Sequence, residues 1–517
     1  MTARVLCLTF VAVLAFAAGA APRSAAVAGG RPETVPALRT WKPEPGRFHL
    51  RRSSRIVVAV PGRGRLRPVA RVLAHDLGRQ RGRAPRVVSR RGARPRTGDV
   101  VLRLGAGDRR LGGEGYRIDV GSKLEIVARR PGGAFYGTRT VLQLLRGPAS
   151  VGRGRGRDRP RYRERGLMLD LGREAFPAGW IIREIRRIAG LKLNTLHLHL
   201  TDDQRWGLES RTHPELASPG ALTIGAMKRI LAVARRHRIE VVPEIDLPGH
   251  SGALLAAHPG LELEPTGTPP PLFAGGKLDI TDPAARRLVA EVLREYMRLF
   301  GGRYLHIGAD EYMAPVAAPY YPQLGEYARR RYGAGAGYRD AIAGFVNRID
   351  RLARRHGKVL RAWNDQLAPG ALVSVDSDVV VDWWTDLSPL SDPSPPAPAE
   401  LLVAGHRIAN KGWFPTYPGY LGGGPTDLAE AYEGWRPDLF CGLVIVERNR
   451  PCAAMTPGES GNLGSSVNAW EQGPRDLDTG SFHRDSLAVI AQKTWASPPL
   501  TRDFDRFTRI VARLGRG

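Results

Sequence analysis

The sequence predicts an α/β protein in which a (β/α)8 TIM barrel follows a small α/β domain. From residue 161 to the end, short apolar strands alternate with amphipathic helices, which is typical of βα units and a parallel sheet. Before that point, short β-rich runs and two helical patterns are grouped within residues 41–150. The chain has 517 residues, which is enough for a barrel and a second domain.

The small domain is predicted from four strand-like runs and two helical patterns. Its clearest feature is a hairpin, because the alternating run Tyr116–Val120 is separated from 123–127 by Gly121 and Ser122. No group of reactive side chains occurs here, so we expect a structural role. The stretch 151–161 is rich in Gly, Arg and Pro and is expected to be a linker. The other predicted elements are strands at 56–60 and 100–104 and helices near 69–77 and 134–145.

The barrel is predicted from eight strand candidates and the helices between them. In the helix expected at 283–300, Asp282 can cap the first turn and one apolar stripe faces inward. A second helix is expected at 338–356, and Gly357 can end it. In such a barrel, chemistry gathers at the carboxyl ends of the strands. The strand candidates are 166–170, 195–200, 240–245, 304–308, 359–363, 379–383, 406–409 and 466–470.

The N-terminus has the pattern of a signal peptide at 1–21. A single Arg4 precedes an apolar run at 5–18, which is short for a membrane span, and small residues follow. We therefore expect a secreted, extracellular protein without a membrane span. Cys441 and Cys452 would remain after cleavage, and they either pair in an exported chain or stay as two free thiols.

The chain is strongly basic, with a formal net charge of +28. The arginines appear dispersed along the sequence and no nucleic-acid motif accompanies them, so a compositional bias is the simpler explanation and no nucleic-acid partner is expected. A weak attraction to anionic cell-wall material stays open.

Polar and aromatic residues follow the predicted strands. Carboxylates serve proton transfer and hydroxyl recognition, whereas flat indoles pack on sugar rings, so this mixture indicates a carbohydrate site. The adjacent Asp310 and Glu311 cannot easily lie on opposite sides of one glycosidic bond, as two separate carboxylates do in many glycosidases. Glu311 would instead protonate the leaving oxygen while Asp310 orients a group of the substrate. Their proximity should raise the pKa of one of them.

Four segments carry a resemblance to a known family. They are Arg165–Asp170, Lys192–Trp206, Val242–His250 and His306–Glu311, and they occur in order over about 150 residues. The chain resembles glycoside hydrolase family 20, the β-N-acetylhexosaminidases. The resemblance implies retaining hydrolysis of β-linked GlcNAc or GalNAc in an oligosaccharide or glycoconjugate. The substrate's own acetamide oxygen would be the nucleophile and would form an oxazolinium intermediate, and neither a metal nor an organic cofactor is implied.

The resemblance also assigns roles to individual residues. Glu311 would be the general acid and base, Asp310 would hold the acetamide N–H, and Tyr420 would donate a hydrogen bond to the acetamide oxygen. Arg165 would bind the 3- and 4-hydroxyls of the sugar. The remaining residues implied for the substrate site are the supporting Asp203, Glu244 and His250 and the walls Trp363, Trp383 and Trp470.

Two positions depart from the family pattern. Gly422 follows Tyr420-Leu421 where the family commonly has Asp, and Gln472 stands where it commonly has Glu. The missing acids usually hold the outer hydroxyls of the sugar, and Glu471 is the candidate to replace one of them. Recognition of the 4- and 6-positions is therefore open.

Two alternatives accompany this interpretation. The first is a non-catalytic carbohydrate-binding protein on the same scaffold, which the two departures motivate and the intact acid pair opposes. The second is a metal-dependent hydrolase, since His197 and His199 point to one face of a strand. Strands five and six end in Trp where further metal ligands would be needed.

Overall fold

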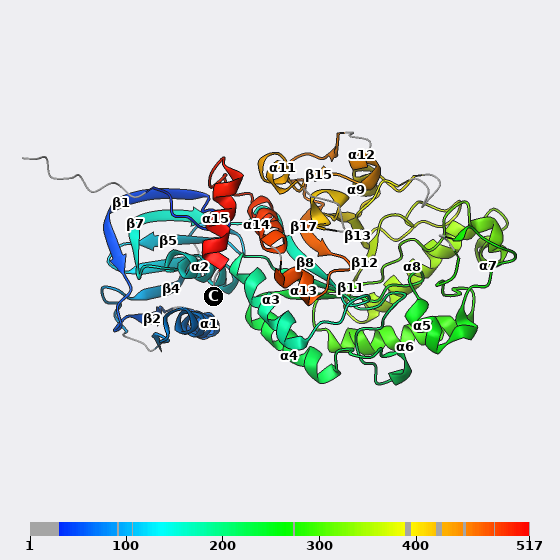
Figure 1. Ribbon diagram of the computed structural model, residues 1–517, viewed down its shortest axis with the longest axis horizontal. Helices are drawn as coiled ribbons and strands as arrows, with labels where there is room; N and C mark the ends of the chain where they lie inside the picture. Colours follow the sequence, from blue (N-terminus) through cyan, green and yellow to red (C-terminus); the bar gives the residue numbers. More distant parts are fainter. Residues whose placement is uncertain are drawn as a thin grey trace, which may run out of the picture.

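The computed structural model describes residues 30–515 except 61, 90–92, 106, 272–273, 388–393, 420–426, 448–450 and 480. The predicted signal peptide at 1–21 lies outside the described residues. The described chain forms a sheet domain and a barrel domain that lie side by side (Figure 1). None of the described helices has the length and apolar character needed to cross a membrane.

The N-terminal domain is a seven-stranded sheet with the order β1-β7-β5-β6-β4-β2-β3. Helices α1 and α2 pack against one of its faces (Figure 1), where they cover the buried side chains of β4, β5 and β6. The predicted hairpin is confirmed as the antiparallel pair β5 and β6. The elements are β1 Thr40–His49, β2 Arg55–Val58, α1 Arg63–Arg81, β3 Arg86–Val88, β4 Val100–Leu104, β5 Tyr116–Val120, β6 Leu124–Ala128, α2 Pro131–Leu144 and β7 Ser150–Asp158.

The stretch expected to be a linker is a strand for most of its length, so that prediction is wrong. In β7, arginines alternate with glycines, and β7 pairs with both β1 and β5. The glycines allow Trp41 to approach, since a Cβ on Gly154 would lie 2.4 Å from its ring. A Gly-Arg repeat has the period of two that a strand requires, and the N-terminal sheet therefore extends to Asp158.

The barrel is closed and parallel, in the order β10-β11-β12-β13-β14-β17-β8-β9. All eight predicted strands are present, each within a few residues of its expected position. The barrel strands are β8 Glu164–Asp170, β9 Thr195–His199, β10 Glu240–Glu244, β11 Tyr304–His306, β12 Val359–Trp363, β13 Val380–Trp383, β14 Arg407–Asn410 and β17 Asn462–Ala469.

Helices surround the barrel, and the two predicted in detail are confirmed. Asp282 Oδ1 accepts a hydrogen bond from the backbone N–H of Ala284 at the start of α6. The helix α8 ends at a left-handed Gly357. The helices are α3 Ala178–Gly190, α4 Ile224–Arg236, α5 Gly252–Ala257, α6 Pro283–Leu299, α7 Pro322–Tyr332, α8 Tyr338–Arg355, α9 Pro398–Val403, α10 Trp413–Thr416, α11 Leu428–Glu433, α12 Leu443–Glu447, α13 Pro474–Thr479, α14 Ser481–Trp495 and α15 Phe504–Gly515.

The long connection between β14 and β17 contains a small two-stranded sheet, β15 Leu439–Phe440 and β16 Ala453–Ala454. A disulfide joins Cys441 to Cys452 within it, so the pairing that an exported chain favours is confirmed. The bond closes a short loop beside the barrel strands that complete the ring.

A buried ion pair joins the two domains. Lys192 Nζ of the barrel lies 2.8 Å from Asp158 Oδ2 of the sheet domain, and both side chains are fully buried. Tyr116 donates to the same carboxylate at 2.6 Å, and Trp495 donates to its other oxygen at 2.7 Å. Hydrogen bonds thus satisfy both oxygens of Asp158, which is the condition under which a buried charge is tolerated.

Candidate active site

The predicted acid pair lies just beyond β11, at the carboxyl ends of the barrel strands. The side chain of Asp310 is 14% exposed and that of Glu311 is 41% exposed. Oδ1 of Asp310 is buried and has no hydrogen-bond partner among the described residues. The pair therefore combines a buried carboxylate that has an open acceptor with an accessible one that can exchange protons.

The backbone around the pair is held in an uncommon conformation. Ala309 and Glu311 both have left-handed φ angles, of 65° and 50°, which non-glycine residues rarely adopt. The backbone N–H of Glu311 donates to Asp365 Oδ2 at 2.7 Å. At Gly308, an added Cβ would lie 1.7 Å from Asp246 Oδ1, so only glycine fits beside that carboxylate. Such conformations cost free energy and commonly occur at functional sites.

Burial changes the acidity of the carboxylates beneath Glu311. It raises the pKa of Asp310 to about 6, while the positive charge of His250 opposes the shift. Burial and the neighbouring Asp310 raise the pKa of Asp365 to about 7, and the same two causes raise that of Asp246 well above its usual value. The expectation that proximity raises the pKa of one acid of the pair therefore applies to Asp310, with burial as the larger cause.

His250 connects the acid pair to two further carboxylates. Its Nε2 lies 3.2 Å from Glu311 Oε2 and 3.7 Å from Asp310 Oδ2. On its other side, Nδ1 lies 3.3 Å from Asp202 Oδ1 and 3.4 Å from Asp203 Oδ2. Burial lowers the pKa of His250, but these carboxylates outweigh that effect and raise it well above its usual value. A charged imidazole thus fixes the orientation of Glu311.

Glu244 has a supporting position inside the barrel. It is fully buried, and its carboxylate lies 2.8–3.2 Å from the imidazoles of His197, His199 and His306. Trp363 Nε1 donates to the same group at 2.7 Å. Glu244 therefore holds the Trp363 ring in place from inside the barrel, away from solvent.

Three side chains of this network have the spacing of a potential metal centre. Atoms of His197, Glu244 and His306 all lie within 4.8 Å of one another. Burial lowers the pKa of His197 to about 4. Burial alone would raise the pKa of Glu244, but the surrounding imidazoles outweigh it and hold that pKa well below its usual value. The carboxylate is already neutralised by the surrounding rings, so the arrangement is a self-contained network.

Aromatic side chains form a cluster next to the acids. Trp363 and Trp470 are 5.8 Å apart between ring centroids, and Tyr417 lies 6.1 Å from Trp470. Trp384 belongs to the same cluster and donates from Nε1 to Asp365 at 2.9 Å. Trp363 and Trp470 therefore lie together in one aromatic cluster at the carboxyl ends of the barrel strands.

The assignment of Trp383 is wrong, and the adjacent Trp384 takes its place. Trp383 is 2% exposed, donates to the carbonyl of Pro396 and packs on Phe440 outside the barrel. Successive side chains of a strand point to opposite faces, so Asp382 points inward and Trp383 outward. The two tryptophans are adjacent in the sequence, and only the direction of the strand's side chains in the folded barrel shows which of them points inward.

Arg165 is also wrongly assigned. It is the second residue of β8, at the amino end of the strand, and it is fully buried. Its guanidinium lies 3.0 Å from Glu114 of the sheet domain and over the ring of Trp495. It therefore belongs to the domain interface, at the opposite end of the strand from the acid pair.

A different arginine, Arg173, lies at the carboxyl end of the barrel. It follows the carboxyl end of β8, and its guanidinium lies 2.9 Å from Asp170 and 2.8 Å from Asp202. It also lies over Trp470 and 3.8 Å from Glu471. The sequence contained one signal for Arg173, since it follows by three residues Asp170, the polar residue that ends the first barrel strand.

Of the remaining predicted positions, Asp203 and Glu471 are exposed to solvent. Asp203 is 44% exposed, and its Oδ1 accepts from the backbone N–H of Gly252 at 2.9 Å. Glu471 is 45% exposed and has a left-handed φ of 55°. The amide of Gln472 donates to the carbonyl of Pro418. Tyr420 and Gly422 fall outside the described residues.

Comparison with known proteins agrees with this geometry. Residues 162–394 match the glycosyl hydrolase family 20 catalytic domain, and residues 31–158 match domain 2 of the same family. A β-N-acetylhexosaminidase of Cellulomonas fimi is 32% identical over 480 residues, which cover 86% of this chain and 86% of that protein. The chain belongs to glycoside hydrolase family 20.

Relatives within family 20 include a lacto-N-biosidase of Bifidobacterium bifidum, which is 32% identical over 485 residues. The match covers 90% of this chain but only 40% of that protein. Among solved structures, the family 20 β-N-acetylhexosaminidase of Streptomyces coelicolor A3(2) superimposes with a TM-score of 0.71 at 28% identity, over 93% of this chain and 94% of that one. A β-hexosaminidase of Streptomyces plicatus in complex with the product GlcNAc gives 0.71 at 27% identity, with 93% coverage of both chains.

Proposed function

We propose that this family 20 hydrolase cleaves β-linked N-acetylhexosamine, GlcNAc or GalNAc, with retention and with the substrate's acetamide as nucleophile. The observation that carries the proposal is the acid pair itself. A buried Asp310 with an open acceptor oxygen lies directly beside an accessible Glu311, and His250 contacts both. This arrangement suits one acid that orients a group and another that transfers a proton.

In the first step, Glu311 donates its proton to the glycosidic oxygen and the bond from C1 to that oxygen breaks. The acetamide oxygen forms a bond to C1 from the opposite face, which gives an oxazolinium ion. Asp310 accepts a hydrogen bond from the acetamide N–H and stabilises the positive charge that develops there. With a pKa of about 6, Asp310 carries its negative charge at neutral pH.

In the second step, water attacks C1 and its proton passes to the Glu311 carboxylate. The bond from C1 to the acetamide oxygen breaks, so the anomeric configuration is retained after two inversions. Trp363, Trp384 and Trp470 present ring surfaces to the sugar and its acetamide. Arg173 is placed to donate to sugar hydroxyls, because its guanidinium is already aligned by two buried carboxylates.

The first test compares two chromogenic substrates, an aryl β-GlcNAc glycoside and the matching β-glucoside. Turnover of only the acetamido sugar supports the proposal, because the glucoside lacks the internal nucleophile. Equal turnover of both would refute it. Tight binding without turnover would support the non-catalytic alternative.

The second test changes each acid in turn. Glu311→Gln keeps the shape and removes the proton, so kcat should fall by about 10²–10⁴ while ligand binding persists. Asp310→Asn should slow the acetamido substrate, because an amide cannot stabilise the charge of the oxazolinium. The matched control is Glu215→Gln, an acid in the surface cluster with His213 and His258, and it should retain wild-type rates.

A second candidate is release of a disaccharide, and the two departures from the family pattern favour it. Gly422 and Gln472 replace the acids that the family resemblance assigns to the outer hydroxyls, and the Gln472 amide bonds to Pro418. Without acids that bind the outer hydroxyls, the site does not need those hydroxyls to be free, so it can accept a sugar that carries a further substituent. One relative is a lacto-N-biosidase. Comparing kcat/KM for aryl glycosides of GlcNAc, GalNAc and lacto-N-biose separates the candidates, since the favoured substrate identifies the unit released.

Export from the cell is part of the same proposal. The pattern at 1–21 is typical of a signal peptide. The Cys441–Cys452 disulfide suits an oxidising compartment, where such bonds form and persist. N-terminal sequencing of the mature protein tests the proposal, and an intact N-terminus on protein retained inside the cells would contradict it.

A further inference from the structure

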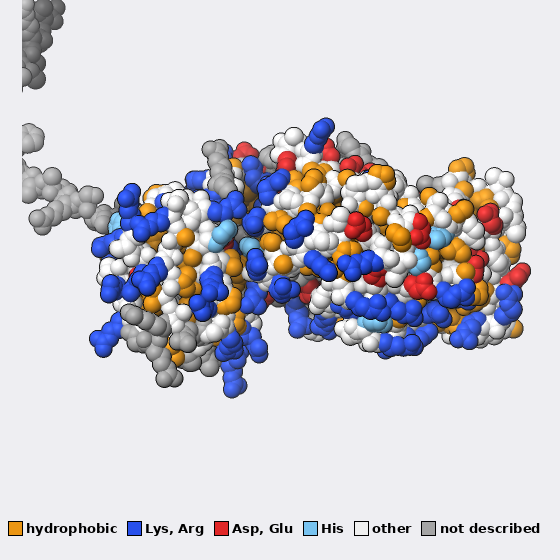
Figure 2. Space-filling view, turned by 90° about the horizontal axis from the view of Figure 1, so that it is seen from below, with side chains coloured by type: hydrophobic (Ala, Val, Ile, Leu, Met, Phe, Trp, Pro, Cys, Tyr) orange, Lys and Arg blue, Asp and Glu red, His pale blue; other side chains and the backbone are white. Residues whose placement is uncertain are grey.

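The positive charge of this chain is concentrated in the N-terminal domain. Residues 31–158 contain 31 Lys and Arg but 9 Asp and Glu, whereas residues 159–517 contain 45 and 41. On the face that Figure 2 shows, basic side chains are scattered over the sheet domain with few acidic ones among them, whereas basic and acidic side chains both occur on the barrel. The arginines, although dispersed along the sequence, are therefore denser in the N-terminal domain than in the barrel. A uniform compositional bias does not explain a domain that is so much more basic than the barrel.

Part of this charge lies on the open face of the sheet. Because α1 and α2 cover one face, the alternate side chains of β5 and β7 point away from them. Arg117 of β5 and the arginines at 155 and 157 of β7 are exposed there. Arg155 is neutralised, with Glu44 at 3.1 Å and Asp119 at 3.3 Å.

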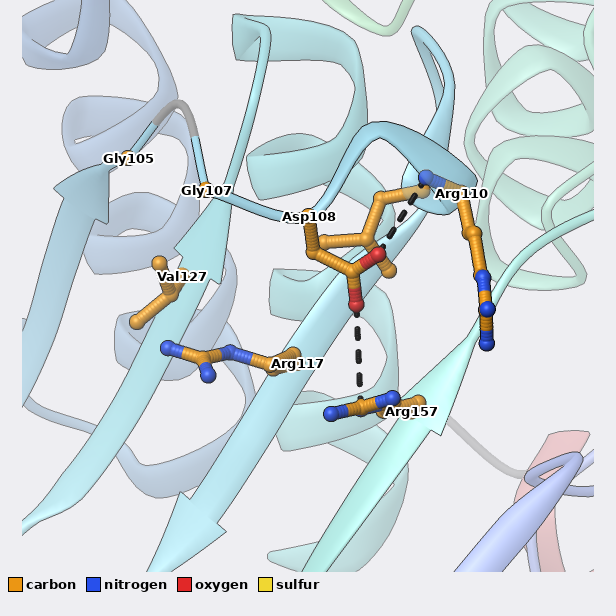
Figure 3. Close-up of a pocket in the computed structure, with 8 residues that line it drawn as sticks. Gly105, Gly107, Asp108, Arg110, Arg117, Val127 and Arg157 are labelled. Atoms are coloured by element: carbon orange, nitrogen blue, oxygen red, sulfur yellow. Dashed lines mark hydrogen bonds and ion pairs between the residues drawn. The ribbon is translucent and has the colours of Figure 1, made fainter.

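A cavity of about 440 Å³ lies on this face. Figure 3 shows the loop after β4 on one side of it and the strands β5, β6 and β7 beneath, with the helices behind the sheet. This volume is within the range of sites that hold small ligands. Its lining residues are Gly105, Gly107, Asp108, Arg110, Leu111, Arg117, Val127 and Arg157.

The charges in this cavity are unbalanced. Arg117 and Arg157 are directly opposite each other in the antiparallel ladder, an arrangement that destabilises a sheet when both residues carry the same charge. Asp108 is 3.7 Å from Arg157. Among the described residues, no ion pair to the guanidinium of Arg110 or Arg117 is found. Three arginines and one carboxylate thus line the cavity, and an added anion would offset the excess positive charge.

We propose that this cavity and the open sheet face bind an anionic polysaccharide, with Arg110, Arg117 and Arg157 holding its sulfate or carboxylate groups. Guanidinium groups bind both kinds of anion through paired, charge-assisted hydrogen bonds. A polysaccharide is the partner, and not a nucleic acid, because the adjoining domain acts on glycans; this choice rests on the proposed function. The sheet domain would then hold the enzyme on material that carries both its substrate and acidic groups.

The test measures binding of a fluorescent heparin oligosaccharide and of an oligogalacturonate by anisotropy, at low and moderate salt. We expect the triple variant Arg110→Ala, Arg117→Ala, Arg157→Ala to raise the Kd of at least one probe by about tenfold or more. The matched control is Arg229→Ala, Arg235→Ala, Arg294→Ala, which removes the same charge from exposed positions on α4 and α6 and should change Kd by less than about threefold.

Three results would overturn the proposal. In the first, the wild-type protein binds neither probe. In the second, both triple variants lose affinity equally. In the third, duplex DNA binds as tightly as the glycans, and the Arg110, Arg117, Arg157 variant loses that binding too. Turnover of a small aryl glycoside should be wild-type in both triple variants, and a circular dichroism spectrum and melting temperature equal to those of the wild type check that the sheet domain is folded. Because turnover depends only on the barrel, failure of the hydrolase proposal would be seen separately from failure of this one.

Discussion

The charge of His250 should set the pH at which the enzyme loses activity on the acid side. Asp310 must be ionised to hold the acetamide, and its pKa is about 6 because burial raises it. The ionised form is therefore present above pH 6 and is lost as the pH falls through that value. In the wild type, kcat/KM for an aryl β-GlcNAc glycoside should therefore decline about tenfold per pH unit below this pKa, which gives the acid limb of the pH profile.

The variant His250→Gln removes a positive charge 3.7 Å from Asp310 Oδ2. A charge pair at that distance is worth roughly 1 kcal/mol in water and roughly 4 kcal/mol at the effective dielectric of a protein. Since one pKa unit equals about 1.4 kcal/mol, the pKa of Asp310 should rise by about one to three units. For each protein, kcat/KM at pH 6 is divided by its own value at high pH. This ratio should be about fivefold or more lower in the variant than in the wild type.

The assay is a kcat/KM profile from pH 4 to 9 at constant ionic strength. The control is His258→Gln, the same substitution in a surface cluster where Nε2 lies 3.0 Å from Glu215, and its acid limb should match the wild type. An acid limb that stays in place in His250→Gln, or moves to lower pH, would show that this imidazolium does not stabilise the Asp310 carboxylate.

Three further predictions follow from the corrected positions. Arg173→Ala should raise KM by about tenfold or more, because a charged hydrogen bond to the sugar is lost. Arg165→Ala should lower the melting temperature and leave KM unchanged. If Arg165→Ala raised KM and Arg173→Ala did not, Arg165 would be the sugar-binding residue. Asp158→Asn leaves a buried lysine without its partner, so chemical denaturation should show a loss of about 3–5 kcal/mol with the pH limb of activity unchanged, and wild-type stability would contradict this account. Trp384→Phe removes the bond to Asp365 and should lower kcat/KM by about tenfold, while Trp383→Phe should not; equal effects would argue against the assigned register.

The sequence by itself determined the fold class, the strand positions and the acid pair. Strand and helix periods are local properties, so the eight barrel strands and the two helices at 283–299 and 338–355 could be located from pattern alone. Glu311 and its neighbour follow a predicted strand, and a parallel barrel brings every such position to one end.

Tertiary structure decided which of two candidate residues lies on the side of the acid pair. Arg165 and Arg173 lie eight residues apart around one strand, and only the direction of that strand separates the domain interface from the active site. Trp383 and Trp384 differ by a single step of a two-residue period. The proton affinity of Asp310 likewise depends on burial by distant strands, which no local pattern contains.

The β7 strand shows the same limit. Its Gly-Arg repeat has the composition of a linker. Only pairing with β1 and β5 made it an inner strand of the sheet and placed Arg157 opposite Arg117. Composition and the period of side chains can be taken from the sequence of a strand. Which residue lies opposite on the neighbouring strand depends on the register between segments far apart in sequence. That long-range register is what the folded structure added.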